Sequence, residues 1–234
     1  MPTKNPSLKN QITGTVQPTF AAARDATSGT VGTGGSGGTP TTFPVAIQYS
    51  KVAGARGDSI SINRFFIEFD TSDISITPAD ATLQIYGVTN TSADFFAVKA
   101  TFSDGSLANG DFDAIDGWSA GADNSSNVTK YSSEVTSWST GAYNNITLTS
   151  DALSDMASVD NFKICLIQSD NDLANVEATT VVKTGIDNIN QIRLAYTEGS
   201  AGYTNNVLGV ASANIAGVNG VATANIASVN GVDT

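Results

Sequence analysis

The feature of this sequence that most constrains its fold is a recurring alternation of apolar and polar residues in short stretches. Between residues 45 and 198, stretches rich in β-branched and aromatic residues are separated by clusters of Gly, Asn, Asp and Ser. The stretches cover residues 45–49, 65–69, 82–88, 95–102, 145–149, 162–168, 181–183 and 191–197. Period-two alternation is typical of half-buried β-strands. Because no helical pattern alternates with them, the sequence predicts an all-β fold, an antiparallel sandwich of two sheets.

One stretch within this region favours a helix instead. Residues 150–157 begin with Ser150, a good N-cap, and place Asp151 in the first turn, which suits a short helix. Alternation and run length also predict the core of the sandwich. The residues expected in it are Phe65, Phe66, Ile67, Phe69, Leu83, Ile85, Phe96, Val98, Ile164, Leu166 and Ile167. Cys165 lies within the last run, so we interpret it as a small buried hydrophobe rather than a nucleophile.

Two segments of different composition flank the predicted sandwich, which we place at residues 46–198. Residues 1–45 contain five of the six prolines and a Gly-rich run at 29–38, which predict an extended N-terminal arm. Residues 1–56 carry a net charge of +4 and the remainder carries −15. A basic arm on an acidic body is suited to docking on an acidic scaffold. The alternative is a solvated, flexible tail.

Residues 199–234 contain a repeat of 11 residues. Residues 209–219 and 220–230 are identical at nine of eleven positions, and a third copy begins at residue 231. One copy is too short to bury its apolar residues, so we expect them to pack against other copies or another chain. The predicted assembly residues are Ile215, Val218, Val221, Ile226, Val229 and Val232. The Asn-Gly pairs at 219–220 and 230–231 predict tight turns. The alternative is a disordered tail of low complexity.

Composition excludes several classes of function. The 234-residue chain has no His and a single Cys, which removes histidine metal sites, the Ser-His-Asp triad and intramolecular disulfides. A net charge of −11 argues against nucleic acid as a partner. No stretch approaches the roughly 18 apolar residues that span a membrane. The N-terminus lacks the apolar core of a signal peptide, so we expect synthesis in a cytoplasm without export by that route.

The central region resembles DNRLRE-type domains, which are jelly-roll modules similar to carbohydrate-binding modules. The resemblance rests on residues 63–74 (Asn-Arg-Phe-Phe-Ile-Glu-Phe-Asp-Thr-Ser-Asp-Ile) and 81–86 (Ala-Thr-Leu-Gln-Ile-Tyr). Later pieces at 117–118, 143–153, 161–170 and 191–196 follow in the family's order, although Gln191 and Ile192 stand where a Pro is expected. The resemblance implies a jelly-roll sandwich over residues 20–198. It leaves the ligand open.

Clustered carboxylates are the first candidate site. Asp111, Asp113 and Asp116 occupy one loop, and jelly-roll modules often hold a structural Ca²⁺ with such residues, although the spacing differs from that of an EF-hand. Asp170 and Asp172 form a second candidate. The alternatives are solvated loop acids or a glycosidase pair that includes Asp113. An exposed, polar loop is a poor setting for the raised pKa that a glycosidase acid requires, so we predict no catalytic residue.

Aromatic residues are the second candidate site, since Trp and Tyr rings on an exposed face stack on sugars. Four of them lie in the most polar stretch of the domain. Trp118 and Tyr143 fall where the resembled family has structural aromatics, so we assign them to the core. Tyr131 and Trp138 remain as the predicted glycan contacts.

The C-terminal repeats resemble the tails of virion proteins of tailed bacteriophages. Together with the missing signal peptide, this resemblance leads us to expect a non-enzymatic structural protein of the virion, either a capsid decoration or head fibre or a tail-associated protein. Its expected partners are further copies of itself, plausibly in a trimer, other virion proteins and a host-surface polysaccharide. No cofactor is expected apart from the structural Ca²⁺. The alternative is a carbohydrate-binding module of a bacterial surface or secreted protein.

Overall fold

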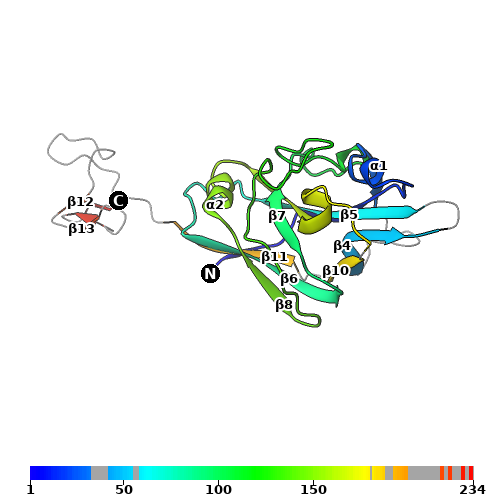
Figure 1. The fold of residues 1–234 in the computed structure, drawn as a ribbon. Coiled ribbons are helices and arrows are strands. Elements are labelled where there is room, and N and C mark those ends of the chain that lie inside the picture. The colour runs from blue at the N-terminus through cyan, green and yellow to red at the C-terminus, as the bar shows by residue number, and fades with distance from the viewer. Residues whose placement is uncertain are drawn as a thin grey trace.

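The computed structural model describes residues 1–32, 42–54, 58–179, 181–187 and 192–199, together with four two-residue strands between residues 217 and 233 (Figure 1). Its strands are β1 (Thr3–Lys4), β2 (Leu8–Gly14), β3 (Gly29–Val31), β4 (Thr42–Val52), β5 (Ser59–Asp70), β6 (Asp80–Asn90), β7 (Phe95–Lys99), β8 (Tyr143–Thr147), β9 (Asn161–Gln168), β10 (Val182–Asp187) and β11 (Ile192–Thr197). All pairs between them are antiparallel. The predicted all-β sandwich is confirmed.

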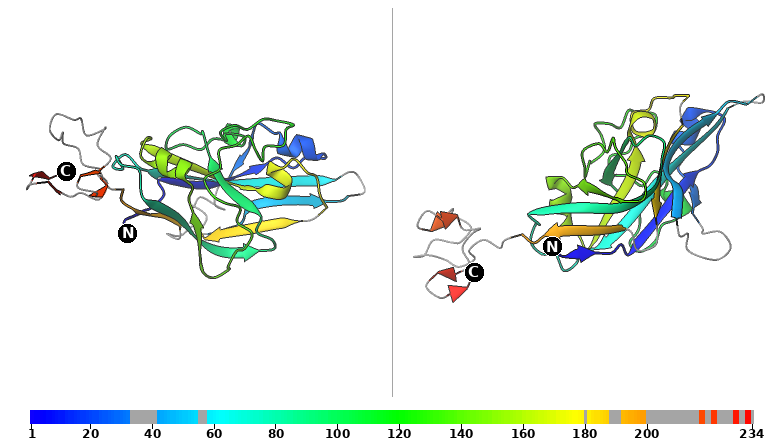
Figure 2. Two further views of the ribbon diagram at one scale, coloured as in Figure 1. Left: turned by 60° about the vertical axis from the view of Figure 1, so that its left-hand side comes forward. Right: turned by 90° about the horizontal axis from the view of Figure 1, so that it is seen from below.

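The strands separate into two layers because β5 and β6 each change partner halfway along their length. One edge of β5 pairs with β2, while the other pairs first with β4 and then with β9. In the same way, one edge of β6 pairs with β8, while the other pairs with β11 and then with β10. One layer therefore contains β7, β9, β5, β2 and β3, and the other contains β8, β6, β11 and β1. Strands β4 and β10 join them (Figure 2).

Strand β5 is buried on both faces, which explains its continuous apolar run. Phe65, Ile67 and Phe69 point into a core between the two layers, where they meet residues of β6, β8, β9 and β11. Phe66 points the other way, into a second core that is covered by α1 (Phe20–Arg24) and by the chain between residues 100 and 130. Apart from Phe96, which is partly buried, every residue predicted for the core is fully buried.

The predicted extended arm is corrected for residues 3–31, which belong to the sandwich. Strand β1 pairs with β11, and β2 pairs along β5 from Leu8 opposite Glu68 to Thr13 opposite Asn63. Helix α1 ends in Arg24, which is completely buried. These strands are polar, and their partners lie far away in the sequence, so composition alone makes them resemble a linker. The Gly-rich residues 33–41 lie outside the described residues.

The remaining elements follow the sequence closely. A helix was expected at 150–157 and occurs as α2 (Ser150–Met156), although its N-cap is Thr149 rather than Ser150. Two short helical turns, η2 (Asn109–Asp111) and η3 (Ser169–Leu173), complete the described structure. Within the described residues, no helix has the length and apolar character needed to cross a membrane.

The C-terminal repeat forms the same backbone pairing twice. Strands β12 (Gly217–Val218) and β13 (Val221–Ala222) pair with each other, and so do β14 (Ser228–Val229) and β15 (Val232–Asp233). The two pairs are offset by the 11 residues of the repeat. Val218 opposite Val221 and Val229 opposite Val232 each bracket an Asn-Gly pair, as a two-residue turn requires. Ile215 and Ile226 lie outside the described residues.

Candidate functional site

The two aromatic residues predicted to contact glycans are buried. Tyr131 is 1% exposed, stacks on Phe162 with 5.1 Å between ring centroids, and donates its hydroxyl proton to the Asp155 carboxylate. Trp138 is 6% exposed, and its indole N–H donates to the Gly185 carbonyl over 3.3 Å. Both belong to the segment 130–138, which forms isolated backbone bridges to β7 and to Leu148. Their rings therefore close the core, and the prediction for them is wrong.

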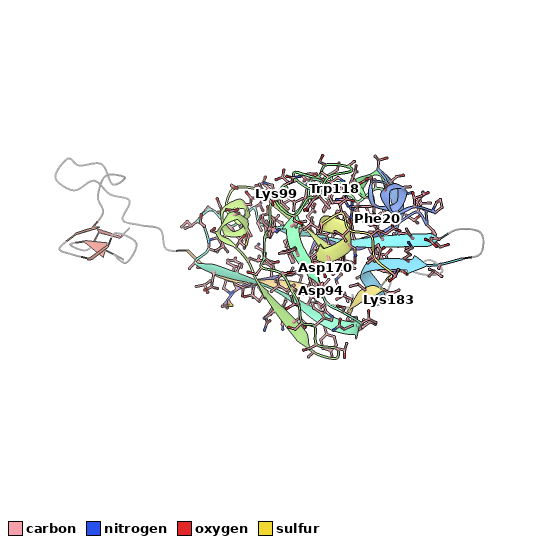
Figure 3. The ribbon with its side chains drawn as sticks, in the orientation of Figure 1. Phe20, Asp94, Lys99, Trp118, Asp170 and Lys183 are labelled. Carbon is pink, nitrogen blue, oxygen red and sulfur yellow. The ribbon has the colours of Figure 1, made fainter. Side chains whose placement is uncertain are left out.

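Of the two aromatic residues assigned to the core, Trp118 packs against the second core, whereas Tyr143 is exposed. Tyr143 is 36% exposed on β8. Trp118 is half-buried in the layer of loops beside α1, where the Arg24 and Arg64 guanidinium carbons lie 4.5 and 4.1 Å from its ring centroid (Figure 3). Trp118 is therefore a structural residue at the surface of the second core, whereas Tyr143 presents its ring to solvent.

The predicted calcium ligands do not gather around one point. Asp111 accepts a hydrogen bond from the Ala108 amide over 2.7 Å and caps η2, while Asp116 accepts from the Thr129 hydroxyl over 2.7 Å. In the part of the chain that the structure describes, no three acidic or Cys side chains are placed to hold a metal ion. The calcium prediction for Asp111, Asp113 and Asp116 is therefore corrected, because the three carboxylates do not converge and those of Asp111 and Asp116 serve separate loop hydrogen bonds.

The second candidate acid, Asp172, instead belongs to a buried charged cluster. Its two carboxylate oxygens accept from Nε and Nη2 of Arg64 over 2.8 and 2.7 Å, and its backbone carbonyl accepts from Nε of Arg24. All three side chains have no exposed surface. Arg24 also donates to the Ala122 carbonyl, and Arg64 to the Phe112 carbonyl. The cluster joins α1, β5 and η3, so its role is structural.

An exposed face that carries both polar and aromatic side chains lies on the outer surface of β6, β8 and β11. Leu83 and Ile85 on β6 and Ile146 on β8 point into the core, so alternation sends their neighbours outward. The register places Gln84 between Arg193 and Asn145, and Tyr86 opposite Tyr143. We call these five residues the β8 platform: Gln84, Tyr86, Tyr143, Asn145 and Arg193.

Contacts within the β8 platform hold its side chains in place. The rings of Tyr86 and Tyr143 meet edge to face with 5.5 Å between centroids. The Arg193 guanidinium carbon lies 4.4 Å from the Tyr143 ring centroid, and Nε2 of Gln84 donates to Oδ1 of Asn145 over 2.9 Å. The Tyr86 hydroxyl donates to the Gly141 carbonyl over 2.7 Å. The platform is therefore ordered before any ligand binds, which lowers the entropy lost on binding.

A groove of about 720 Å³ runs beside the platform, between β8 and the segment 133–139. We call it the β8 groove. Hydroxyl and amide groups dominate its lining. The lining residues are Ser133, Glu134, Val135, Thr136, Ser137, Ser139, Tyr143, Asn144, Asn145, Ile146, Thr147, Leu148 and Thr149. Its volume lies within the range of about 300–1,000 Å³ that is usual for ligand sites. Tyr143 and Asn145 belong to both the groove and the platform, so the two form one continuous surface.

Two contacts close the ends of the β8 groove. At one end Ser132 bridges to Leu148, and at the other Asn144 exchanges hydrogen bonds of 2.7 and 2.9 Å with the Ser139 backbone. Gly87 lets this second end approach β6, because a Cβ there would lie 2.2 Å from the Ser139 carbonyl oxygen and 2.5 Å from Nε1 of Trp138. Only glycine fits this position, so Gly87 helps to define the shape of the groove.

The edge of β8 that faces the groove also offers backbone groups. Within the described chain, β8 as a strand pairs with β6 alone. The Leu148 amide donates to Ala81 and the Gly87 amide to Ala142. Because bonded positions alternate in an antiparallel pair, the N–H and C=O of Asn145 point away from β6. A ligand in the groove therefore meets backbone donors and acceptors as well as side chains.

This surface carries groups that can bind a sugar. It combines tyrosine rings, amides, hydroxyls and one guanidinium, which together match the apolar faces and hydroxyl groups of sugars. Comparison with protein-family models and with curated proteins found no match to this chain. The resemblances to DNRLRE-type domains and to bacteriophage proteins therefore remain predictions.

Proposed function

We propose that this protein is a non-enzymatic display protein whose sandwich contacts glycans through the β8 platform and the β8 groove. The observation that supports this most directly is Tyr143, a tyrosine 36% exposed at the junction of platform and groove. Its ring is held by Tyr86 and Arg193. Sugar C–H groups pack on such rings, while neighbouring amides bond to hydroxyl groups. The residues that we propose to contact glycans are therefore those of the outer sheet rather than the buried Tyr131 and Trp138.

The lining of the groove favours binding without hydrolysis. Glycoside hydrolysis ordinarily requires two carboxyl groups separated by about 5–9.5 Å across the scissile bond. Among the described residues that line the β8 groove, Glu134 is the one carboxyl-bearing side chain. We therefore assign no catalytic residue to this surface.

The direct test of glycan contact is a binding measurement on the full-length protein. We expect the wild type to bind at least one oligosaccharide on a printed array of microbial glycans, and Tyr143→Ala to weaken that binding at least tenfold. Val176→Ala, at an exposed position outside the site, is the matched control and should bind like the wild type. Absence of any binding, or equal binding by Tyr143→Ala, would contradict the proposal.

A second proposal concerns where the sandwich is displayed. The repeated pairing of β12 with β13 and of β14 with β15 supports a tail that assembles with identical copies. Combined with the resemblance of the repeats, it supports a structural protein of a bacteriophage virion, as a capsid decoration, head fibre or tail-associated protein. Its partners would then be two further copies in a trimer and other virion proteins. A carbohydrate-binding module of a bacterial surface protein is the alternative.

Assembly is tested by the mass of the full-length protein in solution, measured by light scattering. We expect an oligomer, and we expect a variant carrying both Val221→Ser and Val232→Ser to dissociate, since each change replaces an apolar residue of the repeat. Melting of the sandwich should be unchanged in the variant. A monomeric wild type at micromolar concentration would contradict self-assembly through the tail, without bearing on glycan contact.

A further inference from the structure

Arg193 is the charged residue of the β8 platform, and among the described residues it has no acidic partner. In the part of the chain that the structure describes, seven ion pairs engage the cations Lys4, Arg24, Lys51, Arg64, Lys99 and Lys163. Arg193 takes part in none of them, although the chain carries 22 acidic residues against 11 basic ones. An unpaired guanidinium on so acidic a protein is therefore a distinctive feature of this face.

The Arg193 side chain is also held in one orientation. It extends from β11 past β6 and places its guanidinium carbon 4.4 Å from the ring centroid of Tyr143 on β8. Its Nε–H is shielded from solvent and has no hydrogen-bond acceptor. An Nε–H that is shielded from water is equally out of reach of a ligand oxygen. The Nη groups of Arg193, which are not shielded in this way, are therefore the donors that a ligand carboxylate meets.

The geometry points to a sugar that carries a carboxylate as the ligand of the β8 platform. This inference rests on the proposed glycan contact and adds the chemical class of the sugar. A guanidinium presents paired N–H groups whose spacing matches a carboxylate, and the charge-assisted bonds that result are strong. In this arrangement Arg193 binds the carboxylate, the sugar ring packs on Tyr143 and Tyr86, and the amides of Gln84 and Asn145 meet its hydroxyl groups.

The charges around the site also set the direction of a bound glycan chain. Glu134 lines the β8 groove on the side of β8 that faces away from β6 and β11. A carboxylate is repelled by Glu134 and attracted by Arg193. The acidic sugar is therefore placed over the platform, and uncharged sugars of the same chain extend into the groove.

The test compares each carboxylated oligosaccharide on an array with the same oligosaccharide after its carboxyl groups are reduced to alcohols. We expect the full-length protein to bind the carboxylated form at least tenfold more tightly. Arg193→Gln should bind the carboxylated form no better than the reduced one, and Arg193→Lys should retain part of the preference, since it keeps the charge but loses the paired geometry. Raising the salt concentration should weaken the wild-type preference.

Lys51→Gln is the matched control, because it also removes one positive charge, but at the C-terminal end of β4 and outside the platform. Lys51 pairs there with Asp58 and Glu177. This variant should leave the preference unchanged. Equal wild-type binding of both forms, or an equal loss in Lys51→Gln, overturns the inference, while the glycan-contact proposal stands if Tyr143→Ala still weakens binding at least tenfold. Absence of binding to every glycan overturns both. Thermal melting confirms that each variant is folded.

Discussion

Two arginines in this molecule pack against aromatic rings, and their surroundings give them opposite roles. Arg64 lies 4.1 Å from the Trp118 ring centroid and 4.2 Å from that of Phe112, fully buried, with Asp172 on two of its nitrogens. Arg193 lies 4.4 Å from the Tyr143 ring centroid at the surface, without an ion pair to any residue that the structure describes. Enclosure and complete pairing make Arg64 part of a structural cluster, whereas the half-buried Arg193 is the arginine that we propose as a recognition residue.

The largest effect should come from breaking the enclosed cluster. Asp172→Ala leaves the buried Arg64 guanidinium without its carboxylate, and such a loss typically costs about 3–5 kcal/mol. We expect the free energy of unfolding, measured with urea, to fall by that amount. A loss below about 1 kcal/mol would show that water reaches Arg64. Arg64 and Arg193 would then differ less than the structure indicates.

Trp138→Ala should be nearly as damaging, because the ring fills the core beside Phe95, with 5.5 Å between ring centroids. Truncating a buried Trp typically costs about 3–5 kcal/mol. Thermal and urea unfolding measure the loss. If Trp138→Ala kept its stability but lost glycan binding, the original assignment of Trp138 to the binding surface would be restored.

Arg24→Ala tests how strongly the first 32 residues are attached. It removes the hydrogen bonds to the Asp172 and Ala122 carbonyls and leaves the Arg64–Asp172 pair intact. Hydrogen bonds from charged groups contribute about 1.5–3 kcal/mol each, so the loss of two leads us to expect a destabilisation of about 3 kcal/mol. Amide exchange should accelerate in β2 more than in β6. Uniform acceleration would contradict a local role.

Tyr143→Ala should change stability little, by less than about 1 kcal/mol, because an exposed cross-strand pair contributes that much at most. Its effect on glycan binding is expected to be at least tenfold. This separation of stability from binding is the sharpest contrast with Asp172→Ala. A large loss of stability would place Tyr143 with the structural residues instead.

The smallest effect concerns Asp170, whose pKa is raised by partial burial and by the nearby carboxylates of Asp94 and Glu134. A raised pKa means that the folded protein favours the protonated acid. The stability from this preference is complete below the ordinary Asp pKa and is lost as the pH rises through the raised value. Asp170→Asn should therefore raise the melting temperature slightly at pH 7, and the difference should vanish near pH 3. A lower melting temperature at pH 7 would contradict this.

Local patterns determined most of the strands and the core. The runs around Phe66 and Leu166, and the alternation of Leu83 and Ile85, predict buried strands because side chains of a strand point alternately to its two faces. The same alternation places Gln84, Tyr86 and Arg193 on the outer face, so part of the β8 platform could be predicted from the sequence. The strand register that brings these residues together with Tyr143 could not be predicted.

The sequence by itself determined the all-β class, the positions of eight strands and of α2, and the apolar core, because these depend on residues that are neighbours in the chain. Only the tertiary structure decided that the N-terminal strands belong to the sandwich, that Tyr131 and Trp138 turn inward, and that Tyr143 and Arg193 meet on the outer face. Each of these depends on pairing between segments far apart in the sequence. The physical reason is that hydrogen-bonded register, rather than residue type, determines which side chains share a surface.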